Sequence, residues 1–412
     1  GLQQIMKQQL EVLSQVMSQQ LEVMRGKGFS AEQRSSSQNG SSQSARFNTA
    51  PVIHFPSSVQ NHHVTESPSF TKLEPNETTP QPSSPSTFWG VEQPGARELS
   101  LQQQRHLEAL IARYTKRTQK SKQRAQAYRP VLADRRASLG FRFEIKEMLY
   151  PIVGQKSLGS RIWDIDGNEY IDLAMGFGVH LFGHGAPFIQ TALQEQLEQG
   201  IQIGPQSEFA GEVAELFCEL TGMERVTFCN SGTEAVMAAV RVARAATGRA
   251  KIALFNGSYH GHSDGTLAIS RNVNGKQQSA PMAIGVSQHA VDDVLVLTYG
   301  APRSLEIIKT HAHELAAVLV EPVQSQRPDL QPKAFLQELR NLTQQAGIAL
   351  IFDEVITGFR IHPGGSQAWF GIDADIATYG KLVGGGIPIG IVAGKAKYMD
   401  RIDGGMWSYG EA

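Results

Sequence analysis

The feature that most constrains the fold of this chain is an apolar run, residues 348–352, that ends in two acids, Asp353 and Glu354. Five apolar residues in a row leave no polar face, which is typical of a parallel strand buried on both sides. Open α/β sheets bind their ligands beyond the carboxyl ends of such strands. We therefore expect Asp353 at the ligand-binding edge of a sheet, with Glu354 on the opposite face because successive strand residues alternate.

Segments with strand and helix patterns alternate along the chain around this run. Strands are predicted at residues 226–229, 252–255, 317–320 and 349–352, and helices at residues 234–246, 305–311 and 335–346. This alternation indicates an α/β fold with a mostly parallel sheet and helices on its faces. A separate hairpin is predicted at residues 163–172, with its turn at residues 166–168.

The chain divides into three parts by composition. Residues 1–25 carry one apolar stripe at helical spacing among many glutamines, which predicts an amphipathic docking or coiled-coil helix. Residues 26–95 are rich in Ser, Pro and Gln and cannot bury enough apolar surface to fold, so we expect a disordered linker. Residues 96–412 form the predicted globular domain, which opens with a polar helix at residues 98–125.

Composition argues against several functional classes. The formal net charge of −1 over 412 residues gives no reason to expect a nucleic-acid partner. No apolar stretch approaches the roughly 18 residues that span a bilayer, and no signal-peptide pattern is visible, so we expect no membrane partner. The two cysteines, Cys218 and Cys229, do not suggest a disulfide scaffold, and a cytoplasmic location is expected.

A second motif, residues 231–234, lies between a predicted strand and a predicted helix. Its small side chains leave backbone N–H groups free to surround an anion, and the helix dipole favours negative charge. The hydroxyls of Ser231 and Thr233 add donors on either side of Gly232. The pattern predicts a phosphate-binding loop, although taken alone it is more often an ordinary helix N-cap.

The third motif places Lys381 just before three glycines, residues 384–386. Alone, a lysine is usually a surface residue, and an acid at a strand end often caps a helix or binds a metal. The order of phosphate loop, strand-end acid and lysine is more specific, because pyridoxal 5′-phosphate chemistry needs all three. Lys381 would form the Schiff base with this cofactor, and Asp353 would keep its pyridine nitrogen protonated so that the ring accepts electrons.

Three further residues complete the predicted site. Tyr259 offers a ring that stacks on the cofactor, and Val355 packs on the opposite side of that cofactor. Glu321 ends the strand predicted at 317–320 and is expected to face the substrate from the same row of strand ends as Asp353; the alternative is an ion-paired loop residue. His184 is expected to be a structural histidine.

A metal site is the main rival interpretation for residues 260–264, which read H-x-H-x-D. Histidine and aspartate are suitable zinc ligands, and the spacing is similar to that of binuclear zinc hydrolases. Gly265 stands where those hydrolases carry another histidine. We therefore expect no metal in this segment.

Taken together, these motifs resemble those of the class III pyridoxal-phosphate aminotransferases. The resemblance rests on residues 231–235, 259–261, 353–360 and 380–381. The branch that is most similar is that of glutamate-1-semialdehyde aminomutase. Within it, residues 175–184 and 327–332 resemble stretches of the aminotransferase domains embedded in hybrid polyketide/nonribosomal peptide synthetases of the mycosubtilin/iturin and microcystin/nodularin type.

The resemblance implies a fold-type I homodimer with pyridoxal 5′-phosphate as cofactor. It implies that Lys381 and Asp353 are catalytic, that residues 231–233 hold the phosphate and that Tyr259 stacks on the ring. The implied activity is transamination of a carrier-bound β-keto acyl thioester to a β-amino acyl thioester, within a megasynthase that makes a secondary metabolite or toxin. Glutamate or glutamine is the implied amino donor.

Two alternative functions stay open. One is a free-standing glutamate-1-semialdehyde 2,1-aminomutase, against which the predicted tether argues; the other is a non-catalytic docking fragment. The family continues well beyond its lysine with a small C-terminal domain, whereas 31 residues (412 − 381) follow Lys381 here. We therefore expect the aminotransferase domain to be incomplete at its C-terminus.

Overall fold

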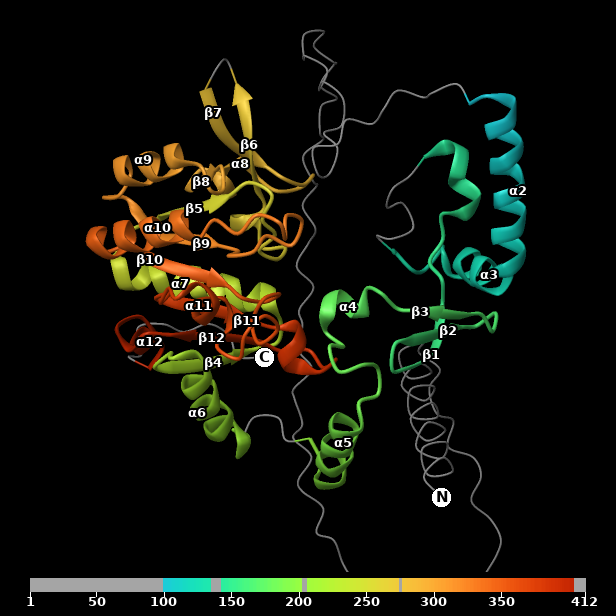
Figure 1. Cartoon of the computed structure of the whole chain (residues 1–412), viewed down its shortest axis with the longest axis horizontal. Helices are drawn as coiled ribbons and strands as arrows, with labels where there is room; N and C mark the ends of the chain where they lie inside the picture. Colours follow the sequence, from blue (N-terminus) through green and yellow to red (C-terminus); the bar gives the residue numbers. More distant parts are fainter. Residues whose placement is uncertain (1–98, 135–141, 202–205, 274–275, 404–412) are drawn as a thin grey trace, which may run out of the picture. The chain divides into compact units, whose positions relative to one another are not determined.

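A computed structural model describes residues 99–134, 142–201, 206–273 and 276–403 of the chain. A seven-stranded sheet organises this part of the chain, and Figure 1 shows how its elements are arranged. These residues all belong to one unit of the chain, Gln81–Ala412. The helix predicted at 1–25 and the linker predicted at 26–95 lie outside the described residues. The same holds for residues 404–412.

The sheet is parallel except for one strand. In spatial order its strands are β4 (Arg225–Cys229), β12 (Gly390–Gly394), β11 (Ile376–Tyr379), β10 (Ala349–Asp353), β9 (Leu315–Val320), β5 (Lys251–Phe255) and β8 (Val294–Leu297). Strand β12 is antiparallel to both of its neighbours, and the other neighbouring strands pair in parallel. The predicted α/β fold with a mostly parallel sheet is therefore confirmed.

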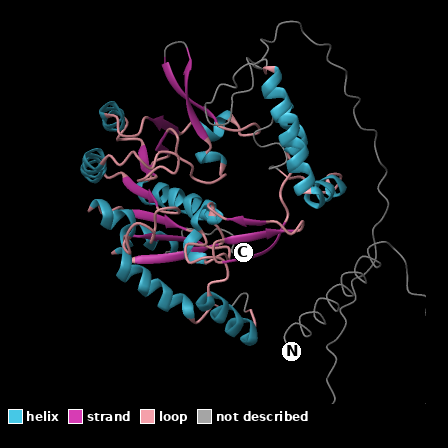
Figure 2. Cartoon of the chain, turned by 45° about the vertical axis from the view of Figure 1, so that its right-hand side comes forward, coloured by secondary structure: helices cyan, strands magenta, loops and turns pink. Residues whose placement is uncertain are grey.

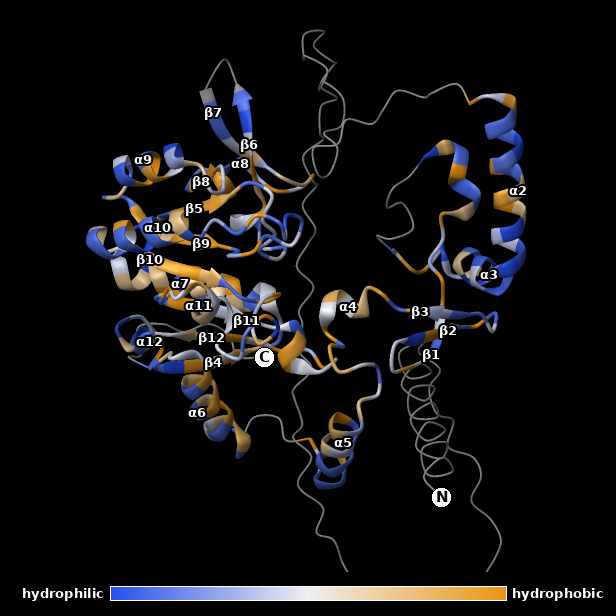
Figure 3. Cartoon of the chain, viewed as in Figure 1, coloured by the Kyte–Doolittle hydropathy of each residue, from blue (hydrophilic) through white to orange (hydrophobic). Residues whose placement is uncertain are grey.

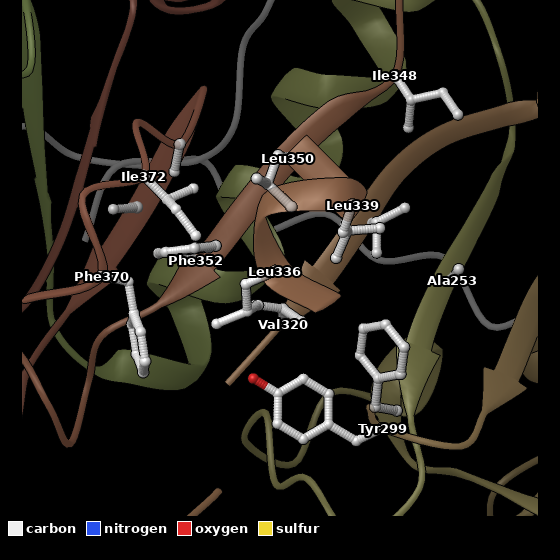
Figure 4. Close-up of a cluster of buried hydrophobic side chains, with 14 of the residues drawn as sticks. Ala253, Tyr299, Val320, Leu336, Leu339, Ile348, Leu350, Phe352, Phe370 and Ile372 are labelled. Carbon is white, nitrogen blue, oxygen red and sulfur yellow. The ribbon is translucent and has the colours of Figure 1, made fainter. Parts of the chain in front are cut away.

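Two apolar cores form because side chains alternate along each strand. One core holds Leu350 and Phe352 of β10 under the helices α6 (Phe209–Thr221), α9 (Pro302–Thr310), α10 (Lys333–Ala346) and α11 (Gly365–Phe370), as Figure 4 shows in part. The other holds Ala349 and Ile351 against α7 (Gly232–Thr247) and α12 (Ala396–Asp403). Asp353 continues the α7 side of β10, and Glu354 continues the other side.

Helices cover both faces of this sheet (Figure 2), and β10 is among its most hydrophobic strands (Figure 3). Helix α7 is rich in Ala and Val, which lets it pack closely on the sheet. It begins at the N-cap Ser231 and ends at Gly248, whose φ of 69° is a left-handed C-cap conformation. These local signals fix the start of α7 beside the pocket described below.

A smaller antiparallel sheet precedes the main sheet in the chain. Its strands are β1 (Gly154–Leu158), β2 (Arg161–Asp164) and β3 (Glu169–Ile171), of which β2 and β3 form the predicted hairpin. The helix predicted at 98–125 is two helices, α2 (Leu101–Arg117) and α3 (Gln119–Tyr128), which corrects that prediction. The reason is tertiary, since the carboxylate of Asp166 in the hairpin turn accepts hydrogen bonds from the backbone N–H groups of Lys120 (2.7 Å) and Ser121 (3.0 Å) and so starts a new helix.

The remaining elements connect these parts. They are η2 (Phe143–Met148), α4 (Met175–Gly178), α5 (Pro187–Gln199), η3 (Asp264–Thr266), the hairpin β6 (Ala268–Val273) and β7 (Lys276–Pro281), α8 (Gln288–Val291) and η4 (Lys381–Gly384). Within the described ranges, the helices are too short or too polar to cross a bilayer.

Candidate active site

One pocket at the carboxyl ends of β9 and β10 brings together all the residues that the sequence predicted for the site. They are Ser231, Gly232, Thr233, Tyr259, Glu321, Asp353, Val355 and Lys381, and the pocket is also lined by Val236, His260, Gly261 and Ile356. The residues come from the start of α7, the loop after β5, the ends of β9 and β10 and the turn after β11. This is the edge at which open α/β sheets bind ligands.

The start of α7 forms one end of the pocket. Ser231 Oγ accepts a hydrogen bond from the backbone N–H of Glu234 at 3.2 Å, so the ordinary N-cap is present as well. The carboxylate of Glu234 accepts from the backbone N–H of Asn230 at 2.7 Å. The N–H groups of the first helical turn, including those of Gly232 and Thr233, have no acceptor within the helix. They can therefore donate to a phosphate.

Two glycines let the chain close tightly around this helix start. A Cβ at Gly232 would lie 3.1 Å from both methyl groups of Val355, so Val355 packs directly on the loop. Gly261 has a φ of +85°, and a Cβ there would lie 2.5 Å from Thr233 Oγ1 and 2.9 Å from Thr233 Cα. The loop after β5 thus touches the backbone of the predicted phosphate loop, and a side chain at Gly261 would force them apart.

The variant Gly261→Ala should therefore lose stability and phosphate affinity. The left-handed conformation alone costs an L-residue roughly 1–2 kcal/mol, and the clash with the Thr233 backbone adds to that cost. Gly265→Ala is the matched control, because a Cβ there meets nothing within 4 Å and its φ is not positive. Urea unfolding and titration with inorganic phosphate measure both effects. Equal behaviour of the two variants would contradict the close approach.

Asp353 is buried and held by three donors. Its Oδ2 lies 2.7 Å from Nδ1 of His260, and its Oδ1 accepts from the backbone N–H of Val355 at 3.1 Å and from Thr378 Oγ1 at 3.4 Å. His260 is 2 % exposed, and its Nε2 has no partner among the described atoms. Three donors fix the orientation of the carboxylate and leave it able to accept one more hydrogen bond.

His260 is the neighbour of Asp353 that the sequence analysis missed. In the sequence, the only signal for His260 was its position between Tyr259 and Gly261. The metal hypothesis treated it as a possible zinc ligand instead. In the structure the two histidines of that hypothesis have separate partners, since His262 Nδ1 lies 3.1 Å from Thr233 Oγ1. The described residues contain no group of three or more His, Cys, Asp or Glu that could hold a metal ion.

Glu354 lies on the other face of the sheet, as predicted from strand alternation. Its carboxylate accepts from the backbone N–H groups of Ser366 (2.7 Å) and Gln367 (3.2 Å) and from Thr357 Oγ1 (3.0 Å). Burial raises the pKa of Glu354. This acid holds the start of α11 and is separated from the pocket by the strand itself.

Lys381 follows β11 in a strained conformation. Its φ is +49°, which is unusual for a residue with a side chain and is typical of functional positions. Burial lowers the pKa of Lys381; the carboxylates of Asp353 and Glu321 oppose that shift, and the positive charge of Arg360 adds to it. A lysine with a lowered pKa supplies the neutral amine that a nucleophile needs.

The remaining predicted residues surround these groups. Tyr259 is 41 % exposed and lines the pocket. Glu321 is buried, and its carboxylate accepts from the backbone N–H groups of Ser325 (2.8 Å) and Tyr259 (3.4 Å) rather than from a cation; burial raises its pKa. His184 lies outside the pocket, where its Nε2 is 2.7 Å from Asp172 Oδ2.

The chain belongs to the class-III aminotransferases, because the family model matches residues 144–410. Pyridoxal 5′-phosphate is the cofactor of this family of enzymes. One relative is a glutamate-1-semialdehyde 2,1-aminomutase of Thermodesulfovibrio yellowstonii, 41% identical over 265 residues that cover 63% of this chain and 62% of the relative.

Solved structures agree with this assignment. An ω-transaminase from Sphaerobacter thermophilus is 35% identical with a TM-score of 0.65, and the match covers 70% of this chain and 68% of that one. A β-phenylalanine aminotransferase from Variovorax paradoxus is 30% identical with a TM-score of 0.62, covering 75% and 68%. The chain spans about 62% of the length of the first aminomutase it matches. The name of the Thermodesulfovibrio yellowstonii relative favours the aminomutase alternative over the megasynthase interpretation.

Proposed function

We propose that this protein transfers amino groups with pyridoxal 5′-phosphate held in the pocket, on a substrate of the kind that glutamate-1-semialdehyde aminomutases take. One observation carries the proposal: Lys381, Asp353 and the start of α7 line the same pocket. An amine, a carboxylate and a group of N–H donors fit the aldehyde, the pyridine nitrogen and the phosphate of that cofactor.

Each group has a separate task in holding the cofactor. The N–H groups at the start of α7, with Thr233, would hold the phosphate at the positive end of the helix dipole. Asp353, fixed by His260 at 2.7 Å, would bind the pyridine nitrogen. Tyr259 and Val355 would lie on opposite faces of the pyridine ring and would hold it between them.

Lys381 is the group that moves protons in this scheme. When bound, pyridoxal 5′-phosphate supplies an electron sink for the electron pair that deprotonation leaves on the substrate carbon. With its amine free, Lys381 would take a proton from the substrate carbon that bears the amino group and would hold that proton for a later return. Glu321 ends on the same edge and would face the substrate, where its carboxylate is held by Ser325 and Tyr259.

A carrier-bound β-keto acyl thioester remains the second candidate substrate. Two observations favour it: a low-complexity segment, residues 26–95, precedes the family match, and a structural neighbour is named for a β-amino acid. A tether between this domain and a carrier protein would raise the effective concentration of a carrier-bound substrate. The homodimer that the family implies, and glutamate or glutamine as donor, belong to this proposal too.

A comparison of turnover on the two substrates decides between the two candidate functions. The intact protein, loaded with pyridoxal 5′-phosphate, is given free glutamate 1-semialdehyde in one reaction and a β-keto acyl carrier protein with glutamate in another. We expect turnover of the free semialdehyde to be at least equal to that of the loaded carrier, measured by product chromatography and by intact-protein mass spectrometry. Faster amination of the carrier-bound acyl chain would favour the β-keto thioester as substrate instead. Absence of turnover in both reactions would refute the proposed amino transfer.

A further inference from the structure

The turn that follows Lys381 is built from glycines, so side chains from outside the turn hold it in place. Each of the three glycines, residues 384–386, faces one side chain that a Cβ would approach to within 3.2 Å: Ile389, Ile189 and His180, in that order. Of these three side chains, only the imidazole of His180 can change its charge. The position of Lys381 at the start of the turn therefore depends in part on the state of His180.

His180 lies between this turn and helix α4. A Cβ at Gly386 would lie 3.2 Å from Cε1 of His180, and a Cβ at Gly176 of α4 would lie 3.5 Å from its Cδ2. The backbone N–H of His180 donates to the carbonyl of Met175 at 3.1 Å, and α4 contacts η4, which begins with Lys381. Met175 (φ 45°) and Lys381 (φ 49°) both have left-handed conformations, and such strain is usually found at functional sites. His180 thus joins two strained segments beside the pocket.

A second histidine and one carboxylate complete the cluster around His180. The ring of His180 stacks on that of His184, with the centroids 4.2 Å apart and the planes at 40°. Nε2 of His184 lies 2.7 Å from Oδ2 of Asp172, whose Oδ1 accepts from the backbone N–H groups of Ala174 and Met175. One carboxylate balances the charge of one imidazolium. A proton on each ring would therefore leave two stacked cations with a single counter-ion.

The surroundings of His180 favour its neutral form. The charged groups that act on it in the described part of the chain are His184 and Asp172. Burial lowers the pKa of His180, the charge of His184 lowers it further, and Asp172 opposes both effects. The segments packed nearby add two cations, Lys381 in the turn and Arg360 against α4, and a cation cannot serve as a counter-ion. The protonated ring is therefore less stable in this cluster than in water.

We propose that neutral His180 positions the turn that carries Lys381, and that protonation of His180 releases this turn. The proton would add a second cation to the stacked pair, so the rings would separate and Gly386 would lose its contact. Because the pKa of His180 is lowered in the folded chain, the closed arrangement is fully stable above the ordinary value of 6.5 and weakens as the pH falls below it. His180 is not among the residues that line the pocket, so it acts through Lys381. The inference rests on the proposed function, which gives the position of Lys381 its importance.

Hydrogen exchange of the backbone at residues 381–390 tests the turn without cofactor or catalysis. The N–H groups of Val383, Gly385 and Ile387 donate within this segment and report on its opening. The full chain and its His180→Phe variant are compared at about pH 7.5 and about pH 5.5, on either side of the ordinary histidine pKa. Phenylalanine keeps a ring against His184 but takes no proton, and the intrinsic exchange rate cancels because the measured peptide is identical. We expect equal exchange at the higher pH, and exchange about tenfold faster in the wild type at the lower pH, as the titration of one proton allows.

His289→Phe is the matched control, because the His289 side chain is 95 % exposed and pairs with Asp292 three residues later. It should exchange like the wild type at both pH values. His180→Leu is a second variant that cannot titrate, with a smaller side chain beside Gly386, and it should also remove the pH dependence. The same pH dependence in the wild type and in both His180 variants would overturn the proposal. Faster exchange in both variants by one factor at both pH values would also overturn it, because His180 would then have a packing role alone.

A second measurement separates this inference from the proposed function. The rate at which Lys381 captures pyridoxal 5′-phosphate covalently should fall more steeply below about pH 6.5 in the wild type than in His180→Phe. Both proteins share the titration of the Lys381 amine, whereas only the wild type releases the turn. If neither protein captures the cofactor but the exchange difference is present, the proposed function fails and the pH-dependent turn stands. If both capture the cofactor with the same pH profile, the positioning of Lys381 by His180 is refuted even in an active enzyme.

Discussion

Lys381→Ala is expected to abolish turnover while leaving the fold intact. The variant removes both the amine that binds the cofactor covalently and the base that moves the substrate proton, and loss of a positioned base alone costs about 10²–10⁴-fold in rate. The start of α7 and Asp353 are unchanged, so pyridoxal 5′-phosphate should still bind, without a covalent bond. Turnover of an amino donor and the absorbance of the bound cofactor measure the two effects.

Borohydride reduction followed by peptide mapping identifies directly which lysine binds the cofactor covalently. We expect the cofactor on Lys381, and Lys397→Ala is the control because that lysine is exposed at 63 % and lies near Asp375 instead. A reduced cofactor adduct on Lys395 or Lys397 would refute the assignment of Lys381 as the Schiff-base lysine. Because burial lowers the pKa of Lys381, its neutral form appears at lower pH than that of a free lysine. Covalent capture of the cofactor should therefore occur below the pH at which exposed lysines react.

Asp353→Asn is expected to give the second largest loss. The substitution keeps the shape of the side chain but removes the negative charge that would hold the pyridine nitrogen protonated. A charge-assisted hydrogen bond is worth roughly 1.5–3 kcal/mol, which corresponds to about 10–150-fold in rate. His260 loses its charged acceptor at the same time, so the loss should reach at least this range. Single-turnover rates measure it without interference from product release.

Glu354→Gln is a stringent control for Asp353→Asn. The two acids are consecutive and both buried, yet they lie on opposite faces of β10. The Glu354 carboxylate holds the start of α11 and does not line the pocket, so Glu354→Gln should affect stability rather than the chemistry. Turnover per folded molecule should stay near that of the wild type. A rate for Asp353→Asn within about threefold of the wild type corresponds to a change in activation free energy below about 1 kcal/mol. That result would refute the proposed role of Asp353.

Much of the scaffold could be predicted because its signals are local. The run at residues 348–352 is apolar throughout, which is typical of a strand buried on both faces. The N-cap Ser231 and the Gly248 C-cap delimit α7 in the same local way. The antiparallel strand β12 was not predicted, because its sequence, Gly-Ile-Val-Ala-Gly, carries no information about direction. Its place between β4 and β11 is set by pairing with distant strands.

The sequence by itself determined which acid of the pair faces the site, because side-chain alternation along a strand is a property of the backbone. Only the tertiary structure decided what each site residue touches. His260 and Asp353 are 93 positions apart, and Arg360 meets Gly178 from a distant part of the chain. Contacts of this kind depend on how the sheet stacks its loops at one edge, and no local pattern encodes that arrangement.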